Sequence, residues 1–359
     1  MKQSDILTRR ALFRGFRDGA MAAALASIGL PLSAAEAASS PETRRTDNPA
    51  SEVKPGKPVV ADPIAIPPPI HRNHGVHHDL KLIVDEHYAE IAPGVLFRFL
   101  TFSGQVPGPM IRVRRGDTVS LTLENPSGNL LTHNIDMHAI YATGGGARAT
   151  SVKPGESKTV HFTAMYPGAF IYHCAVAALD MHISSGMYGM IVVEPKGGLP
   201  EVDREFYLGQ NEIYTDKEYN VPGVNQFDYK RMIEEDPVYV VFNGATDALT
   251  LGRFGEMRAS VGETIRVFMV NGGPNLTSSF HPIGNVWTDA WPQGAFTNVP
   301  LHYIQTQPVP PGSTFVGHMK LPVPQTIKLV DHALSRVVWK GLLAEIKVEG
   351  PDNPDIFRS

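Results

Sequence analysis

The segment AFIYHCAVAALDMHISSGMYGMIVVEP, residues Ala169–Pro195, decides how this chain folds. Its two ends are rich in apolar, β-branched and aromatic residues, a pattern that predicts two strands joined by a loop. Cys174, the only cysteine of the 359 residues, lies between them, directly after His173. His182 and Met187 follow within the same loop. Four side chains of metal-binding types in one short connection indicate a metal site.

The same strand signals recur before this segment. Gly 33 and Pro 30 are high counts that favour many turns and short strands over long helices. The segments that alternate or are β-branched and end at glycine or proline are Val95–Phe102, Met110–Asn125, Ser157–Cys174 and Gly186–Pro195. The fold class predicted from them is all-β.

The second half of the chain repeats the first. RVRRGDTVSLTLEN at Arg112 resembles RASVGETIRVFMVN at Arg258, an offset of 146 residues. HNID at His133 corresponds to HPIG at His281, and YPGAFIYHC to VPQTIKLVDH, which ends at His332. Ordered matches at a nearly constant offset predict a duplicated β-domain. The second copy has no cysteine, so it cannot hold the same kind of metal site.

The ligand types of the first copy favour copper. A thiolate, two imidazoles and a weak axial methionine form the blue-copper set, and Cys174, His182 and Met187 follow the spacing Cys-x₇-His-x₄-Met. His133, on an earlier strand, is the candidate for the remaining ligand. Zinc is the other metal to weigh, but zinc sites seldom use methionine.

A second metal site is expected on the opposite side of the strands. Successive residues of a strand point to opposite faces, so His173 points outward if Cys174 points inward. By the same parity His138 and Asp136 face outward near it. Two histidines are an incomplete site, and His332 is the candidate third ligand, from this chain or a neighbouring one. The prediction is a buried electron-transfer copper joined through the backbone to an open three-histidine copper.

The N-terminal sequence pattern indicates an export signal. The pair Arg9-Arg10 precedes an apolar run, Gly19–Leu32, and the small residues Ala35–Ala37, which is typical of a twin-arginine signal peptide over residues 1–38. The apolar run is shorter than the ~20 residues that span a bilayer. We therefore expect a periplasmic mature protein without a membrane span. The formal net charge of −4 gives no indication of nucleic-acid binding.

The motifs THNIDMHA, YHCAVAALDMHISSGMYGMIVVEP, NGGPNLTSSFHPIG and LVDHALSRVVWKG resemble those of the copper-containing nitrite reductases. The resemblance runs from about Val76 to Gly350, and is nearest to the subgroup with seven residues between the copper Cys and the next His. It implies two tandem cupredoxin-like Greek-key β-barrels in a homotrimer. The expected domains are a flexible arm at 39–75, a first cupredoxin domain at 76–197 with the type 1 copper, a second at 198–350, and a tail at 351–359.

The resemblance also implies a role for each site residue. The type 1 copper would be held by His133, Cys174, His182 and Met187. The type 2 copper would be held by His138, His173 and, from the adjacent subunit, His332. Asp136 and His281 would bind nitrite and handle protons, and Ile283 would shape the nitrite pocket. The implied partners are nitrite and a small periplasmic electron donor, a cupredoxin or a c-type cytochrome, and the implied process is denitrification or other nitrogen metabolism.

Two other functions are open to the sequence. A laccase-like multicopper oxidase needs several His-x-His pairs for its trinuclear cluster, and the chain has none. A copper electron carrier would explain the type 1 set alone. The stretch HRNHGVHH, His71–His78, could capture copper but is expected to be an exposed linker, because it precedes the first clear strand. Copper content separates the functions, at two ions per chain for a nitrite reductase, four for the oxidase and one for the carrier.

Overall fold

The structure is a computed structural model that describes residues 54–358. The predicted signal peptide and the first part of the predicted arm lie outside the described residues. Within the part described, no helix has the length and apolar character that crossing a membrane requires.

Two sheets are formed by the first half of the chain, with one short strand added from beyond it. The larger sheet has the order β10-β2-β1-β4-β6, and the smaller has the order β3-β8-β7-β5. The strands of the larger sheet are β1 (His77–Ala92), β2 (Val95–Phe102), β4 (Thr118–Glu124), β6 (Ser157–Thr163) and β10 (Gly223–Asn225). Those of the smaller are β3 (Gly108–Arg114), β5 (Asp136–Met137), β7 (Gly168–His173) and β8 (Tyr188–Glu194).

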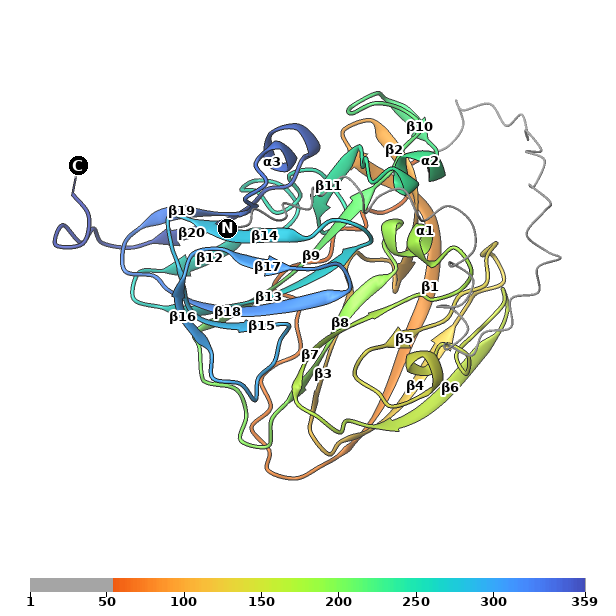
Figure 1. The fold of residues 1–359 in the computed structure, drawn as a ribbon, viewed down its shortest axis with the longest axis horizontal. Helices are drawn as coiled ribbons and strands as arrows, with labels where there is room; N and C mark the ends of the chain where they lie inside the picture. Colours follow the sequence, from red (N-terminus) through yellow and green to blue (C-terminus); the bar gives the residue numbers. More distant parts are fainter. Residues whose placement is uncertain (1–53, 359) are drawn as a thin grey trace, which may run out of the picture. The chain divides into compact units, whose positions relative to one another are not determined.

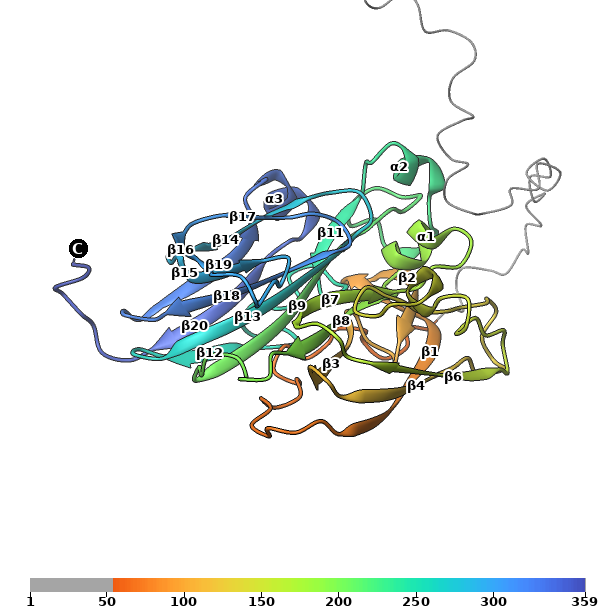
Figure 2. The same ribbon diagram turned by 60° about the horizontal axis from the view of Figure 1, so that its bottom comes forward.

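The second half forms two further sheets, which lie beside those of the first half (Figures 1 and 2). Their orders are β11-β9-β13-β18-β15-β16 and β12-β20-β19-β14-β17. The six-stranded sheet contains β9 (Arg204–Ile213), β11 (Tyr239–Phe242), β13 (Thr264–Gly273), β15 (Trp287–Pro292), β16 (Leu301–Ile304) and β18 (Ser313–Lys320). The other contains β12 (Met257–Ser260), β14 (Ser278–Ile283), β17 (Gln307–Val309), β19 (Gln325–Asp331) and β20 (Ala344–Glu349).

The strand pairings repeat in the two halves, as the sequence repeat predicts. β1 pairs parallel with β4, as β9 does with β13, and β3 pairs parallel with β8, as β12 does with β20. The antiparallel pairs β7·β8 and β5·β7 correspond to β19·β20 and β14·β19. The predicted all-β, two-domain cupredoxin-like fold class is confirmed, while the limits of each domain stay a prediction.

Helices are few and short. α1 (Leu179–Ser184), α2 (Tyr229–Ile233) and α3 (Ser335–Lys340) accompany a single 3₁₀ turn, η1 (Thr143–Gly146), in residues 54–358. α1 differs from the sequence prediction, which has only a loop between the strands that flank Cys174. One turn of helix is too short to leave a recognisable apolar period, and α1 has no capping side chain at its start.

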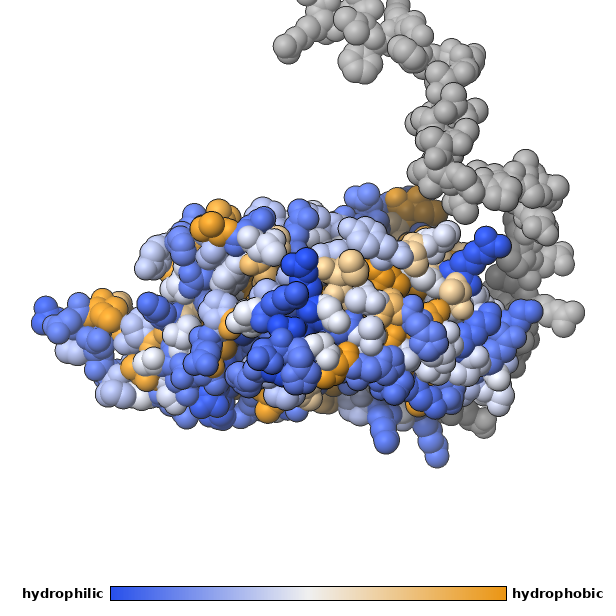
Figure 3. Space-filling view, turned by 90° about the horizontal axis from the view of Figure 1, so that it is seen from below, coloured by the Kyte–Doolittle hydropathy of each residue, from blue (hydrophilic) through white to orange (hydrophobic). Residues whose placement is uncertain are grey.

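Three apolar clusters hold the sheets together. One lies between the two sheets of the first half and contains Cys174, Met187 and Met137, and a second fills the other half around Trp287 and Phe280. The third joins the halves, because it combines residues such as Phe97 with others such as Phe268. On the face shown in Figure 3 the surface is largely hydrophilic, with hydrophobic residues in separate small groups.

Residues 54–75 pack against this body, unlike the flexible arm that their composition predicts. Val59 and Ala61 are buried, and Val106 donates to the Val59 carbonyl and accepts from the Ala61 amide at 2.7 and 3.0 Å. These β-bridge-like bonds give the proline-rich segment a fixed course. The histidine-rich stretch is also only partly a linker, since β1 begins at His77.

Candidate metal centres

Three predicted type 1 ligands meet in a closed group. The Nδ1 atoms of His133 and His182 are 3.2 Å apart, and the Cys174 Sγ lies 3.9 Å from the first and 3.5 Å from the second. His133 and Cys174 are fully buried and His182 is 3% exposed. Two imidazole nitrogens and a sulfur that converge in the interior are placed to act together as ligands of one cation.

The closed group is built by the loop that the sequence singled out. Cys174 follows β7 directly, His182 lies on α1, and Met187 precedes β8. The Cys174 amide donates to the Met187 carbonyl at 3.1 Å, and the Met187 amide donates to the His182 carbonyl at 3.0 Å. The turn between them needs Gly186, whose φ is +115° and whose added Cβ would lie 2.5 Å from Val106. Met187 is fully buried in the same apolar cluster as Cys174.

Burial governs the protonation of these groups. It raises the pKa of the Cys174 thiol, against backbone hydrogen bonds that act to lower the pKa. It also lowers the pKa of His182 to about 4, assisted by the neighbouring His133 and opposed by Glu86. His182 is therefore neutral near pH 7 and keeps a lone pair for a metal. The thiol needs a bound cation to favour its deprotonated form.

A second, open group has Asp136, His138 and His173, whose ligand atoms lie within 4.8 Å of one another. The Nε2 atoms of His138 and His173 are 3.2 Å apart. Asp136 pairs with His173 across β5 and β7, which brings the carboxylate beside the ring. The His173 Nδ1–H donates to the Cys174 carbonyl at 2.9 Å, so its Nε2 is left for a ligand.

The open group differs from the closed one in exposure. His138 lies at the surface, while Asp136 is half-buried and His173 is 8% exposed. The part of the His138 ring that faces His173 still loses solvent, and this desolvation lowers its pKa together with the charge of His173, against the opposing charge of Asp136. The two groups include consecutive residues, His173 and Cys174, and each residue belongs to a different group. That separation is the one that strand alternation predicts.

The second-half residues form a third location. His281 lies on β14 and His332 follows β19, and their ring centroids are 5.3 Å apart. The His281 Nδ1–H donates to the Gln305 carbonyl at 2.7 Å, and His332 is exposed. Ile283, at the end of β14, is 40% exposed. Among residues 54–358, His332 does not join the group of His138 and His173.

Sequence reasoning missed two polar residues at the closed group. Asn134 accepts at Oδ1 from the Ala175 amide at 2.7 Å and lies 3.7 Å from the Cys174 Sγ. Glu86, on β1, accepts from the His133 Nε2 at 2.9 Å. Asn134 could have been suspected as the neighbour of a ligand. Glu86 is 47 residues from its partner, and no local pattern connects the two.

The donor set selects among metals. One thiolate, two imidazoles and a thioether-bearing residue at a buried site suit copper, whereas zinc sites rarely include methionine. The open group offers imidazoles and a carboxylate, with His138 at the surface, and within residues 54–358 it contains only two histidines. A third ligand from elsewhere would complete it. The assignment of individual ligands stays a prediction.

Comparisons with known proteins give a consistent result. A family described as multicopper oxidase matches residues 84–198. A copper-containing nitrite reductase of Neisseria meningitidis is 43% identical over 292 residues, which is 81% of this chain and 75% of the relative. The copper-containing nitrite reductase of Neisseria gonorrhoeae is 41% identical over 94% of this chain and 86% of the relative's chain. The solved copper nitrite reductase from Nitrosomonas europaea superposes with a TM-score of 0.69 at 33% identity, over 79% of this chain and 98% of that one.

Proposed function

Since this chain belongs to the copper-containing nitrite reductases, we propose that it reduces nitrite to nitric oxide, NO₂⁻ + e⁻ + 2H⁺ → NO + H₂O. It is an oxidoreductase with copper as its cofactor. The observation that carries the proposal is the pair of donor groups, one closed and one open, joined by His173 and Cys174.

The two groups would hold two coppers per chain. The type 1 copper would be held by His133, Cys174, His182 and Met187, and the type 2 copper by His138, His173 and the His332 of a neighbouring copy. When bound, copper supplies one-electron chemistry at the first site and a place for nitrite at the second. His173 and Cys174 are consecutive, so a short covalent connection links the two donor groups.

Protons would be handled by Asp136 and His281. The ligand atom of Asp136 lies within 4.8 Å of those of the two open-site histidines, and in its protonated form Asp136 can donate to a small anion held there. His281 is oriented by its bond to the Gln305 carbonyl, which leaves Nε2 free to exchange a proton with substrate. Because His281 lies with His332, both would reach the open site from the same neighbouring copy. Ile283, partly exposed on the same strand, would form an apolar wall of the nitrite pocket.

A homotrimer is the assembly that this arrangement favours. Two histidines of one chain remain an incomplete site, while His332 is exposed and lies outside their group. The helix that follows it, α3, exposes Val338 and Trp339, and Leu334 directly before the helix is also exposed. Such apolar side chains suit a subunit interface. The twin-arginine signal favours the periplasm, where a small cupredoxin or c-type cytochrome would donate electrons and the reaction would serve denitrification.

The alternative functions have less support. Solved multicopper oxidases such as one at 24% identity share the fold alone. An electron carrier would leave the open group without a purpose.

Copper stoichiometry with optical and EPR spectra tests the proposal on the mature protein. We expect two coppers per chain, one type 1 and one type 2 signal, and nitric oxide formation from nitrite with a reduced donor. One copper per chain with no nitric oxide formed would contradict it. Light scattering on the same sample tests the trimer.

A further inference from the structure

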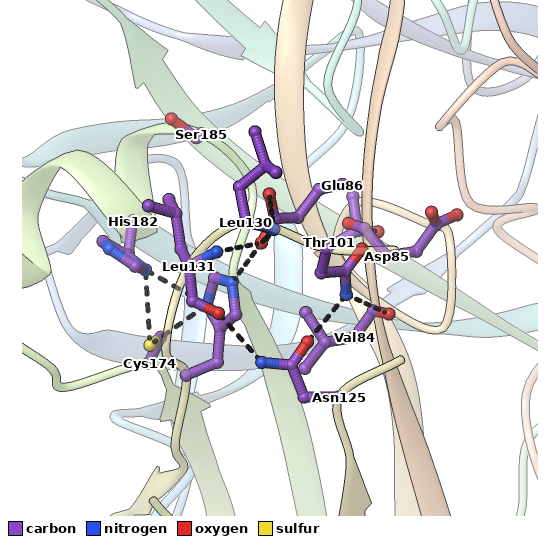
Figure 4. Close-up of polar contacts among 12 residues, drawn as sticks. Val84, Asp85, Glu86, Thr101, Asn125, Leu130, Leu131, Cys174, His182 and Ser185 are labelled. Atoms are coloured by element: carbon purple, nitrogen blue, oxygen red, sulfur yellow. Dashed lines mark hydrogen bonds and ion pairs between the residues drawn. The ribbon is translucent and has the colours of Figure 1, made fainter. Parts of the chain in front are cut away.

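Glu86 has a buried carboxylate that contacts His133 at the ring nitrogen facing away from Cys174 and His182. Its side chain is 1% exposed and accepts from the His133 Nε2 at 2.9 Å. The backbone amides of Leu130 and Leu131 donate to the same carboxylate at 3.2 and 3.0 Å, and the Arg98 guanidinium also donates to it. Figure 4 shows the carboxylate between the loop that carries the ligand and β1. Four donors on one carboxylate favour its ionised form.

The loop before His133 is held on β1 by further hydrogen bonds. The Asn129 side chain donates to the Val84 carbonyl at 3.0 Å and to the Asn125 Oδ1 at 2.8 Å. The Asn125 side chain donates to the Leu131 carbonyl at 2.9 Å. Glu86 therefore acts on a loop that is already pinned, which leaves it a role beyond holding the chain in place.

The charge of Glu86 decides which nitrogen of His133 carries the proton. The two backbone amides and the Arg98 guanidinium donate to Glu86 whichever tautomer His133 adopts, and three such donors favour the ionised carboxylate. An ionised carboxylate only accepts, so the His133 Nε2 must be the donor. The Nδ1 lone pair is then directed at the gap between Cys174 and His182.

His182 has a different environment. None of the residues 54–358 forms a hydrogen bond with its Nε2, and its only nitrogen contacts are those of Nδ1 with Cys174 and His133. The two imidazoles of the closed group are thus unequal, because one has an anionic partner and the other has none. A negative charge on the far side of a ligand imidazole increases its donor strength and favours the more highly charged metal ion.

We propose that Glu86 is a positioning residue that sets the tautomer of His133 and lowers the reduction potential of the type 1 copper. This rests on the proposed copper site, but on no step of nitrite reduction. The carboxylate, compensated in part by Arg98, stabilises Cu(II) relative to Cu(I) through His133.

Redox titration of the copper-loaded variant Glu86→Gln, followed by its visible absorption, tests the proposal. The amide has the same shape without the charge, so the one-electron equilibrium should move toward Cu(I) by about tenfold, which is 59 mV for a one-electron couple. Glu90→Gln is the matched control, since Glu90 is an exposed acid on the same strand. It should leave the potential unchanged.

Arg98→Gln supplies a test of opposite sign. Loss of the compensating cation should move the equilibrium toward Cu(II), by a factor of about three to ten, because Glu86 then acts with its full charge. Structural loosening has no reason to move the two variants in opposite directions. If Glu86→Gln does not fold or does not retain copper, Arg98→Gln decides alone.

The proposal would be overturned if the one-electron equilibrium of Glu86→Gln stays within twofold of wild type. It would also be overturned if both variants shift in the same direction. Where only Arg98→Gln is available, an unchanged equilibrium in that variant would overturn it. The titration uses no nitrite. A wild type with a normal type 1 signal and no nitric oxide formation would sink the proposed function and leave this inference standing.

Discussion

The closed and open groups contain histidine pairs of equal separation and different character. In each pair the two facing nitrogens are 3.2 Å apart, but these are Nδ1 atoms in the closed group and Nε2 atoms in the open one. The closed pair is buried with a thiol, while His138 of the open pair reaches the surface beside Asp136. Burial and the hydrogen bonds on the opposite ring nitrogens, rather than the spacing of the histidines, distinguish the group closed to solvent from the group that is open to it.

The two groups also differ in completeness. The closed group obtains all four of its predicted ligands from the first half of the chain, whereas the open group offers two histidines and a carboxylate. The second half has the same strand pairings without a cysteine, and its His281 and His332 lie together and belong to neither group. The second half therefore keeps the strand pairings without a cysteine site, and its exposed His332 would be available to a neighbouring copy.

The change with the largest expected effect is His332→Ala, which should break the open site alone. We expect loss of type 2 copper and loss of nitrite reduction to the background rate, because two histidines hold the ion weakly. The type 1 absorption should be unchanged. EPR and copper analysis measure the outcome, with His302→Ala, another exposed histidine of the second half, as the control. Full activity with normal type 2 copper would show that the third ligand lies elsewhere.

Cys174→Ala breaks the closed site instead. Visible absorption should vanish, since thiolate-to-copper charge transfer needs the sulfur, and turnover with a protein electron donor should be lost. The type 2 EPR signal should persist because the open group uses only imidazoles and Asp136. Strong visible absorption retained in the variant would remove Cys174 from the type 1 site.

Variants of the two proposed proton-transfer residues are expected to have the next largest effect on turnover. Asp136→Asn and His281→Ala should each lower turnover by a factor on the order of 10² while both coppers remain bound. Steady-state nitrite reduction with copper counting is the measurement, and the exposed Asp79→Asn is the control. Near-normal rates in copper-replete Asp136→Asn would exclude this residue from proton transfer, and loss of copper would make it structural.

The smallest effects are expected from pH. Two protons are consumed per nitrite, so activity should fall as pH rises above neutrality, by about tenfold per unit for each group that must be protonated. The type 1 absorption should stay constant between pH 5 and 8. The pKa of His182 is lowered to about 4, so this ligand is neutral throughout that range and is protonated only in stronger acid. Parallel pH profiles of rate and absorption check both; a spectrum that changes near pH 6.5 would contradict the assignment.

Local sequence patterns were sufficient for much of the fold and the closed site. The run Val95–Phe102 coincides with β2, because alternation and flanking turns act within a few residues. The spacing of Cys174, His182 and Met187 identified a single loop, and strand alternation separated His173 from Cys174. These are short-range consequences of backbone geometry, so they can be inferred from neighbouring residues.

The tertiary structure decided what depends on distant parts of the chain. Residues around Val59 pack against Val106, although their composition suggests an arm, because Val106 donates one backbone hydrogen bond to this segment and accepts another from it. α1 forms around His182 under the constraint of the surrounding sheets, since one helical turn has little stability of its own. Glu86 meets His133 across 47 residues, and this contact determines which nitrogen carries the proton. By itself the sequence determined which side chains are available as ligands. The packing of the sheets decided how deeply these side chains are buried, which of them are protonated and which of them share a site, because these properties depend on contacts between residues far apart in the chain.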